Sequence, residues 1–221
     1  MHEDIKNFYN NDIDKLKNLD LWIVGLLRRD SHPSHAGFDE IMEYVNYLKP
    51  RIKKEKVIAF IAGGPNKYYD FNDEIIEEIF VKTKKNFINQ GYQLIFIPSM
   101  RTPQRIIDKA RNFFDDDQII IQDIDKKAYL SSLKLANHII VTCDSTSMIS
   151  EAAMSGRPIY VAQMPAIKKN IRFKKFFELF KSLEIIKNLG DGAEEWNYKK
   201  LNETDRISGY IEKQFKDYDF S

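Results

Sequence analysis

The strongest constraint on the fold is an alternation, from residue 57 onward, of short apolar runs rich in β-branched residues with longer segments of helical period. This alternation predicts a parallel sheet wrapped by helices, because parallel strands need a crossover connection between them. The runs are continuously apolar, which is typical of strands buried on both faces. We therefore expect an α/β fold, a Rossmann-like parallel sheet with helices on both faces. The expected strands are residues 57–62, 92–98, 138–143 and 158–163, with a shorter fifth at 118–122.

Helical segments fill the gaps between these runs, and several carry signals at their ends. Asn72 is expected to cap a helix over residues 73–89 that stops at Gly91. Thr102 is expected to cap the next helix, residues 103–114, with Pro103 at its first position. Two further helices are expected over residues 126–136 and 147–155.

The two ends of the chain differ from this pattern. Residues 1–55 are too short for a second α/β domain and are expected to form a remnant or linker of helix, short strand and helix. Residues 56–221 are expected to form one Rossmann-like domain with C-terminal helices. In that tail, residues 168–183 predict a basic, phenylalanine-rich helix, and a last helix is expected from about Glu203.

Composition argues against several classes of protein. The 34 Lys and Arg residues balance 33 Asp and Glu residues, so the net charge of +1 gives no global attraction to nucleic acid. Cys143 is the sole cysteine, which excludes an internal disulfide and fits a reducing compartment. The apolar runs fall far short of the ~20 residues of a membrane-spanning helix, and the N-terminus lacks the pattern of a signal peptide. A cytoplasmic protein is expected.

Candidate ligand-binding residues lie on three loops that follow predicted strands, where open α/β sheets receive their ligands. The first loop contains Gly63, Gly64, Asn66 and Lys67. The two glycines would let the backbone approach a phosphate closely, and Lys67 could supply a compensating charge. A tight turn after a strand explains the same residues equally well.

The second loop contains Ser99, Arg101 and Thr102, just before a predicted helix. A helix N-terminus carries positive charge, so Arg101 is unfavourably placed there unless an anion binds. An arginine simply exposed to solvent is the plain alternative. On either interpretation, replacing Arg101 is expected to change the thermal stability of the ligand-free chain little.

The third loop carries the strongest signal and contains Asp144, Ser145, Thr146 and Ser147, with Glu151 one turn into the following helix. Small hydroxyl residues at a helix start provide side-chain and backbone donors for a diphosphate, and Glu151 could accept hydrogen bonds from ribose hydroxyls. Helix capping alone is the competing explanation.

The three loops together resemble the signature segments of the elongated-mitochondria family of mitochondrial fission proteins. The resembling segments are AGGPNKYY at residues 62–69, SMRTP at 99–103 and IVTCDSTSMISEA at 140–152. GRPIYV at residues 156–161 and LNETDR at 201–206 are similar to the family as well. The resemblance runs in matching order from about Gly25 to the C-terminus.

This resemblance implies a GT-B-like architecture, in which two Rossmann-like domains face each other and the C-terminal one holds the nucleoside diphosphate of a sugar donor. Plant members are associated with mitochondrial division and dynamin recruitment, and bacterial members are regarded as glycosyltransferases. The N-terminal, acceptor-holding domain is almost wholly absent from this sequence. The expected explanations are a C-terminal piece of a split or truncated protein, or a chain that works beside a separately encoded acceptor domain.

As an enzyme, the chain would take a nucleoside-diphosphate sugar as donor substrate and need no cofactor. The resemblance places Gly63, Gly64, Arg101, Ser145 and Ser147 around the diphosphate and Glu151 on the ribose. No metal is predicted, because the sequence has no Asp-x-Asp and no His or Cys cluster with ligand spacing. His32 and His35 are candidate general bases. Histidines in a polar loop such as this one are, however, more often solvated than catalytic.

The alternative is an adaptor that keeps the fold without turnover. Its binding surface would be the basic helix of residues 168–183, through which a peripheral membrane contact is also open. The competing explanation is that the phenylalanines of this helix pack against the sheet or a partner domain and its lysines are solvated. A dinucleotide-dependent epimerase or dehydrogenase is disfavoured, since no Gly-x-Gly-x-x-Gly follows the first strand.

Overall fold

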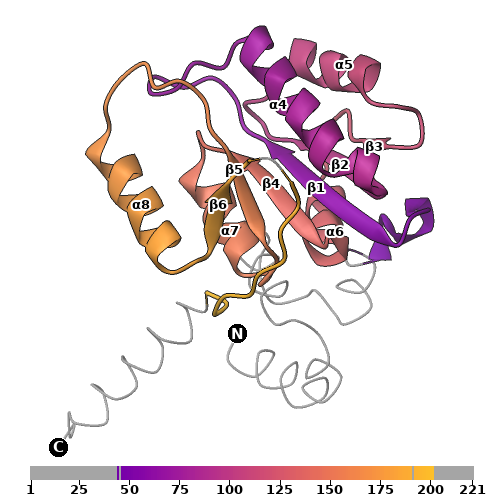
Figure 1. The fold of residues 1–221 in the computed structure, drawn as a ribbon. Coiled ribbons are helices and arrows are strands. Elements are labelled where there is room, and N and C mark those ends of the chain that lie inside the picture. Colours follow the sequence, from indigo (N-terminus) through magenta and orange to yellow (C-terminus); the bar gives the residue numbers. More distant parts are fainter. Residues whose placement is uncertain (1–43, 45, 191, 202–221) are drawn as a thin grey trace, which may run out of the picture.

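Helices and parallel strands alternate through the part of the chain that the computed structural model describes, which is residue 44, residues 46–190 and residues 192–201 (Figure 1). The elements are, in chain order, η1 (Lys49–Arg51), β1 (Lys56–Ala62), α4 (Asp73–Asn86), η2 (Ile88–Gln90), β2 (Tyr92–Pro98), α5 (Gln104–Phe113), β3 (Ile119–Ile120), α6 (Lys126–Leu135), β4 (His138–Thr142), α7 (Thr146–Ala153), β5 (Ile159–Ala162), α8 (Ile171–Ser182) and β6 (Ile186–Asn188).

All strands of the described sheet are parallel, and their spatial order is β3-β2-β1-β4-β5-β6. This is the strand order of doubly wound Rossmann sheets. Successive strands are added on one side of β1 up to β3, and from β4 onward they are added on its other side. Right-handed crossovers place the helices before this reversal on one face of the sheet and the helices after it on the other. Accordingly, α4 and α5 cover one face, and α6 and α7 cover the other (Figure 1). The expected α/β fold class is confirmed.

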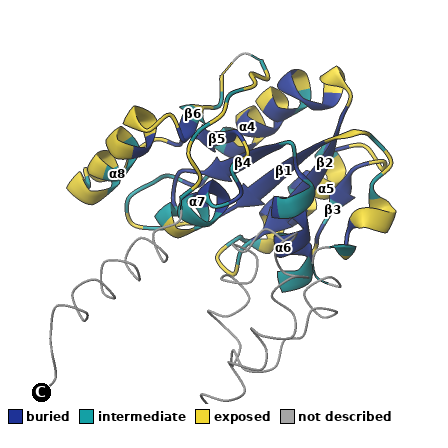
Figure 2. Ribbon diagram, turned by 90° about the horizontal axis from the view of Figure 1, so that it is seen from below, coloured by how far each residue is buried: buried dark blue, intermediate teal, exposed yellow. Residues whose placement is uncertain are grey.

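The sheet is the core of the molecule, and Figure 2 shows its central strands as buried. Every residue of β2 is buried, as is every residue of β1 except Lys56. On the face covered by α4, the rings of Phe60, Phe80 and Phe96 contact one another with centroids 5.5 to 5.9 Å apart. Such close packing holds the strand ends, and therefore the loops that leave them, in fixed positions.

Most sequence predictions of elements are confirmed, with ends that differ by one to a few residues. The helix expected over residues 73–89 ends at Asn86 and continues as the short turn η2, and Gly91 closes it with a left-handed φ of 87°. Strand β6 was not predicted, because Ile186 is its only apolar residue. The expectations for residues 1–43 and for a helix from about Glu203 lie outside the described residues.

No helix in the described part of the chain combines the length and apolar character needed to cross a membrane.

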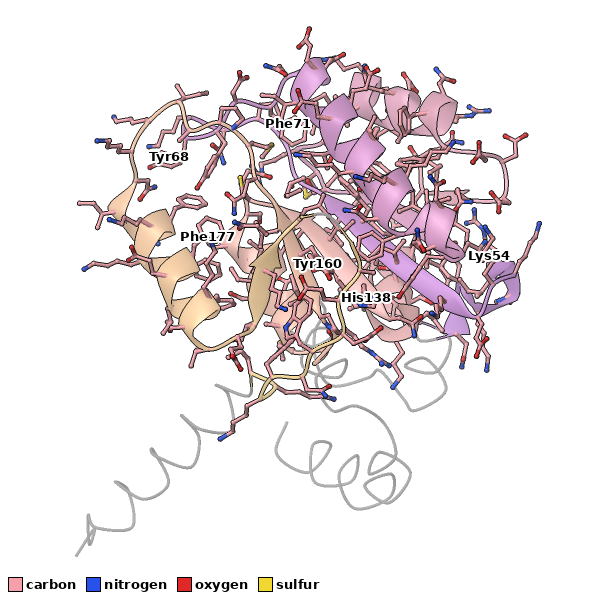
Figure 3. All side chains as sticks on the ribbon, in the orientation of Figure 1. Lys54, Tyr68, Phe71, His138, Tyr160 and Phe177 are labelled. Carbon is pink, nitrogen blue, oxygen red and sulfur yellow. The ribbon has the colours of Figure 1, made fainter. Side chains whose placement is uncertain are left out.

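A buried histidine lies at the start of β4, at the edge of the sheet opposite the candidate loops. His138 is packed among the rings of Phe87, Tyr92 and Tyr160, and it lies close to Tyr160 in Figure 3. Its Nε2 lies 3.0 Å from the carbonyl oxygen of Glu194, whereas Nδ1 has no hydrogen-bond partner among the described residues. Burial lowers the pKa of His138, and the Glu194 carbonyl and the Glu195 carboxylate oppose this shift.

We expect His138 to make the folded state less stable as the pH falls below the ordinary histidine pKa of about 6.5. Because its pKa is lower in the folded chain, the unfolded chain takes up the proton first, and the free energy of unfolding falls by up to about 1.4 kcal/mol per pH unit. Above that pH the ring is neutral in both states and contributes no pH dependence. Urea unfolding at pH 7, 6 and 5 should therefore give a smaller loss for His138→Phe than for wild type. Equal losses in the two proteins would contradict the assignment, since the other histidines are common to both.

Candidate functional site

The candidate site lies where the strand order reverses. The neighbouring strands β1 and β4 end at Ala62 and Thr142, and β2 ends beside β1 at Pro98. The loops that follow these strands therefore leave the sheet at one edge, outside the carboxyl ends, which is where open α/β sheets bind ligands. Direct hydrogen bonds and an ion pair join the three loops, as the sequence predicted for a shared site.

Asp144 connects the first and third loops. Its side chain is 1% exposed; Oδ2 accepts a hydrogen bond from the Gly64 N–H at 3.1 Å, and Oδ1 accepts one from the Thr142 hydroxyl at 2.6 Å. The main-chain oxygen of Asp144 accepts a third from Asn66 Nδ2 at 3.1 Å. Asp144 was expected to contact ligand, but its oxygens are engaged within the protein. Its structural role is to hold the glycine loop against β4.

Arg101 completes this linkage from the second loop. Its Nη2 lies 2.7 Å from Asp144 Oδ2, and its Nη1 donates to the Gly64 carbonyl oxygen at 3.2 Å. The chain itself therefore supplies an anion for Arg101, and the predicted contact of Arg101 with a diphosphate stays a prediction. Removing Arg101 would leave a buried carboxylate without its cation, so the expectation of unchanged stability is replaced by one of a loss. The Arg101 side chain as a whole is 43% exposed, so part of it stays in contact with solvent.

The other arginine near this helix start is also paired. Arg105 Nη1 lies 3.0 Å from Asp73 Oδ1, at the start of α4, and its Nη2 donates to the Phe71 carbonyl oxygen.

Thr102 does not cap α5, so that prediction is wrong. Its Oγ1 lies 2.6 Å from the Gly63 carbonyl oxygen and 2.9 Å from that of Ala62, and it accepts a hydrogen bond from the Ser99 N–H at 2.8 Å. The helix begins later, at Gln104, because Pro103 is extended with φ −64° and ψ 143° and occupies the cap position itself. Ser99 and Thr102 thus fasten the second loop to the end of β1.

The two glycines of the first loop are required by space. A Cβ on Gly63 would collide with the Asp144 carboxylate, and a Cβ on Gly64 would collide with the backbone carbonyl of Arg101. Neither glycine has a positive φ. The close contacts that require glycine here are with the neighbouring loops of the chain, and the predicted approach to a phosphate stays a prediction.

The N-terminus of α7 is the part of the site with open hydrogen-bond donors. Ser145 is the N-cap residue, and its Oγ accepts from the Met148 N–H over a long 3.4 Å. Thr146 and Ser147 begin the helix, one residue earlier than predicted, so their N–H groups have no intrahelical acceptor. Ser147 is exposed, and Ser145 and Thr146 are partly buried. These donors and the helix dipole favour an anion at this point.

Lys67 and Glu151 are the two remaining predicted ligand contacts among the described residues. Lys67 is exposed, with Nζ 5.1 Å from the centroid of the Tyr68 ring. Glu151 Oε2 accepts a hydrogen bond from the Tyr129 hydroxyl at 2.6 Å, which ties α7 to α6. The expected ribose contact of Glu151 stays a prediction. Both candidate general bases, His32 and His35, lie outside the described residues.

A fourth loop, residues 163–170 after β5, borders the site and was missed by sequence reasoning. The Ile167 N–H donates to the Tyr68 carbonyl oxygen at 2.8 Å, and the Asp70 N–H donates to that of Pro165 at 2.9 Å. The ring of Phe173, on α8, contacts the rings of Tyr68 and Tyr69 at 5.5 and 5.3 Å. No local signal could have revealed these contacts, because they join segments about a hundred residues apart.

The reactive groups nearest the site are held protonated. Burial raises the pKa of the Cys143 thiol to about 12, and its Sγ accepts a hydrogen bond from the Met164 N–H at 3.3 Å. Burial, with the neighbouring Cys143 and Asp144, raises the pKa of Tyr69 to about 12. A thiolate of Cys143 or a phenolate of Tyr69 is therefore disfavoured at neutral pH.

One hollow of the described structure lies away from this site. A cavity of about 540 Å³ opens at the amino-terminal ends of β1 and β2, between Lys56, Lys85, Tyr92 and Glu195. No group of three or more His, Cys, Asp or Glu side chains with the arrangement of a metal site occurs within the described ranges.

Comparison with known proteins assigns the chain to a family. The family model described as Mitochondrial fission ELM1 matches residues 34–215. The chain belongs to this family. That range includes all three loops of the site, so the resemblance inferred from their sequences is confirmed.

Two relatives extend the match. Uncharacterized protein RP120 of Rickettsia prowazekii (strain Madrid E) is 30% identical over 208 residues, which cover 91% of this chain and 56% of that protein. Mitochondrial fission protein ELM1 of Arabidopsis thaliana is 31% identical over 93 residues, 39% of this chain and 20% of the plant protein. The chain thus spans about half the length of its Rickettsia relative and a fifth of its plant relative.

Solved structures share a distant likeness. A protein of Listeria monocytogenes assigned as a UDP-N-acetylglucosamine 2-epimerase aligns with a TM-score of 0.49 at 13% identity, over 79% of this chain and 52% of that one. The UDP-GlcNAc 2-epimerase of Neisseria meningitidis, solved with UDP-GlcNAc bound, aligns with a TM-score of 0.47 at 14% identity, over 88% and 44%.

Proposed function

We propose that the loops at the carboxyl ends of β1, β2 and β4 bind the diphosphate of a nucleoside-diphosphate sugar, and that the chain is the donor-binding half of a glycosyltransferase. The observation that supports this most is that three segments typical of the family contact one another where the strand order reverses, beside the N-terminus of α7. An anion placed there meets backbone N–H groups, small hydroxyls and the exposed part of one guanidinium.

The proposed chemistry is the stabilisation of a leaving group. When the acceptor hydroxyl attacks the anomeric carbon, the bond from that carbon to the phosphate oxygen breaks, and its electron pair remains on the diphosphate. The hydroxyl proton passes to a general base, which the acceptor-binding domain would supply. The N–H groups of Thr146 and Ser147, the hydroxyls of Ser145 and Ser147, and Arg101 would face this growing charge. Because the packed sheet and the bonded loops fix these groups beforehand, they need little reorganisation during the reaction.

Asp144 supports this arrangement without opposing the ligand. Its carboxylate is covered, and its charge is compensated by Arg101 at 2.7 Å. The anion therefore faces the outer side of the guanidinium and the helix end, with the carboxylate behind them. Lys67 is the additional exposed cation on the first loop.

Ser145 gives the sharpest test of the diphosphate site. We expect Ser145→Ala to weaken the binding of a nucleoside diphosphate by about fivefold, the loss of one neutral hydrogen bond of about 1 kcal/mol. The stability loss should lie near the low end, about 0.5 kcal/mol, because the capping distance is a long 3.4 Å. Isothermal titration against UDP, GDP, ADP and CDP, paired with urea unfolding, measures both.

The matched control is Ser182→Ala, which removes an exposed hydroxyl bonded to the Leu179 carbonyl oxygen on α8. It should leave nucleotide affinity unchanged. If Ser145→Ala loses stability and no affinity, the residue is a cap alone. If the wild-type chain binds no nucleotide at millimolar concentration, the adaptor function is preferred.

We further expect the purified chain to bind a donor yet transfer sugar slowly. The acceptor would bind on a facing domain, and the chain spans 56% of its Rickettsia relative. Donor hydrolysis and transfer to a panel of hydroxyl acceptors, measured for the chain alone, should stay near background. Robust transfer in that assay would contradict the need for a complementary acceptor-binding domain.

A further inference from the structure

Helix α8 presents a surface that the candidate site does not use. It lies at one end of the described body in both ribbon views (Figures 1 and 2). Its phenylalanines point inward: Phe180 is buried, Phe176 contacts it with ring centroids 4.0 Å apart, and Phe177 lies between α8 and the strands in Figure 3. The packing explanation of these rings is therefore correct. What remains outside is a different set of apolar residues.

We name this exposed surface the α8 outer face. Its apolar members include Ile171, which is 72% exposed, and Leu179, which is 54% exposed. Ile171, Lys175, Leu179 and Leu183 follow at intervals of four, so they lie along one side of the helix. The face consists of the apolar Ile167, Ile171, Leu179 and Leu183 and the basic Lys168, Lys169, Arg172, Lys174, Lys175 and Lys181, all exposed.

Charge on this face is strongly segregated. Residues 168–183 contain six basic side chains and one acidic side chain, in a chain whose net charge is +1. The acidic residue, Glu178, lies 3.7 Å from Lys174 and offsets only that charge. Positive charge is therefore concentrated on one end of a nearly neutral molecule, which attracts an anionic surface and orients the molecule on it.

We propose that the α8 outer face docks on an anionic lipid surface. Exposed aliphatic side chains along a helix, surrounded by lysines, match the composition of helices that lie in the membrane interface. The lysines would contact lipid phosphates while Ile171 and Leu179 enter the boundary of the acyl chains. An acidic peptide fits less well, because α8 is a convex helix at the end of the body, whereas helical peptides bind in grooves.

Docking by this face would place the candidate site beside the lipid. The face begins at Ile167, whose N–H is bonded to the Tyr68 carbonyl oxygen of the first loop. The loops of the site and the start of α8 thus form one continuous edge. The proposal does not depend on nucleotide binding, and vesicle binding is measured without nucleotide.

The test is flotation of the full chain with vesicles of phosphatidylcholine, alone or with about 30 mol % phosphatidylglycerol, at about 0.15 M salt. Wild type should float with the anionic vesicles and not with the neutral ones. Lys168→Gln/Lys175→Gln should lower the partition coefficient on the order of 25-fold, about fivefold for each charge. Ile171→Ser/Leu179→Ser should lower it at least tenfold with all charges retained. Thermal unfolding checks that the variants remain folded.

The matched control is Lys82→Gln/Arg111→Gln, which removes two exposed charges from α4 and α5. It should keep more than half of the wild-type binding. The proposal is overturned if wild type ignores anionic vesicles, or if the control loses as much binding as the α8 charge variant. Full vesicle binding by Ile171→Ser/Leu179→Ser would also overturn it. That result would show that the aliphatic side chains do not enter the lipid, and charge attraction alone would fit an acidic protein partner equally well.

Discussion

Asp144→Ala should lower the free energy of unfolding by about 2–5 kcal/mol, the largest expected effect of a single side-chain deletion at the site. The carboxylate is 1% exposed and accepts from the Gly64 N–H and the Thr142 hydroxyl. Without it, two buried donors lose their acceptor, at about 1–3 kcal/mol each. The half-exposed Arg101 is stranded less severely, because water can solvate it. Urea unfolding of the full chain measures the loss.

The control for this prediction is an aspartate in an exposed ion pair. Asp115 is 61% exposed and lies 3.1 Å from Lys84 Nζ. Surface pairs contribute about 0–1 kcal/mol, so Asp115→Ala should be nearly neutral. Arg101→Ala should destabilise the wild type and cost much less in the Asp144→Ala background, because the two residues act as a unit. Equal losses for Asp144→Ala and Asp115→Ala would show that the carboxylate does not hold the loops.

The same variant separates support of the site from contact with the ligand. Asp144 faces the glycine loop and Arg101, with its oxygens already engaged. Its removal should therefore weaken nucleotide binding by loosening three loops together, and a stabilising osmolyte should restore part of the affinity. Ser145→Ala should not respond in that way, because the proposed Ser145 contact is direct.

The fold was predictable because its signals are local. Continuous β-branched runs such as residues 138–142 identify buried strands, and Gly91 marks a helix end by a conformation that glycine adopts easily. The strands whose ends support the site were all predicted. Strand β6 was missed because Ile186 alone carries the apolar signal, and its assignment depends on pairing with β5.

The site was predictable in position and less so in its internal bonds. A sequence shows that Arg101 and Asp144 each follow a strand, and the order of parallel strands brings them to one edge. It does not show that these two residues, 43 positions apart along the chain, form a pair, since that depends on the side-chain geometry of a finished fold. The failure at Thr102 has the same origin. Its sequence position favoured helix capping, but its hydroxyl instead bonds to the carbonyl oxygens of Ala62 and Gly63 at the end of β1.

Among substitutions that add one methyl group in the described chain, Gly64→Ala should lower the free energy of unfolding most. Because Gly64 has no positive φ, alanine could adopt its backbone conformation, and the cost comes from space. The added Cβ would overlap the backbone carbonyl of Arg101, which cannot rotate away as a flexible side chain could. The second loop must therefore shift, which disturbs the ion pair with Asp144 as well. We expect a loss of about 3 kcal/mol or more, the upper range for overpacking.

Gly190→Ala is the matched control, since its Cβ would meet only the Asn188 carbonyl oxygen at an ordinary 3.8 Å. That change should stay within about 0.5 kcal/mol, because alanine also narrows the unfolded ensemble. Urea unfolding and nucleotide titration of both variants decide the role of the glycine. If Gly64 only permitted a flexible turn, Gly64→Ala would cost no more than about 1 kcal/mol. A loss that small, with nucleotide affinity intact, would mean that the first and second loops are not packed against each other as closely as their contacts indicate.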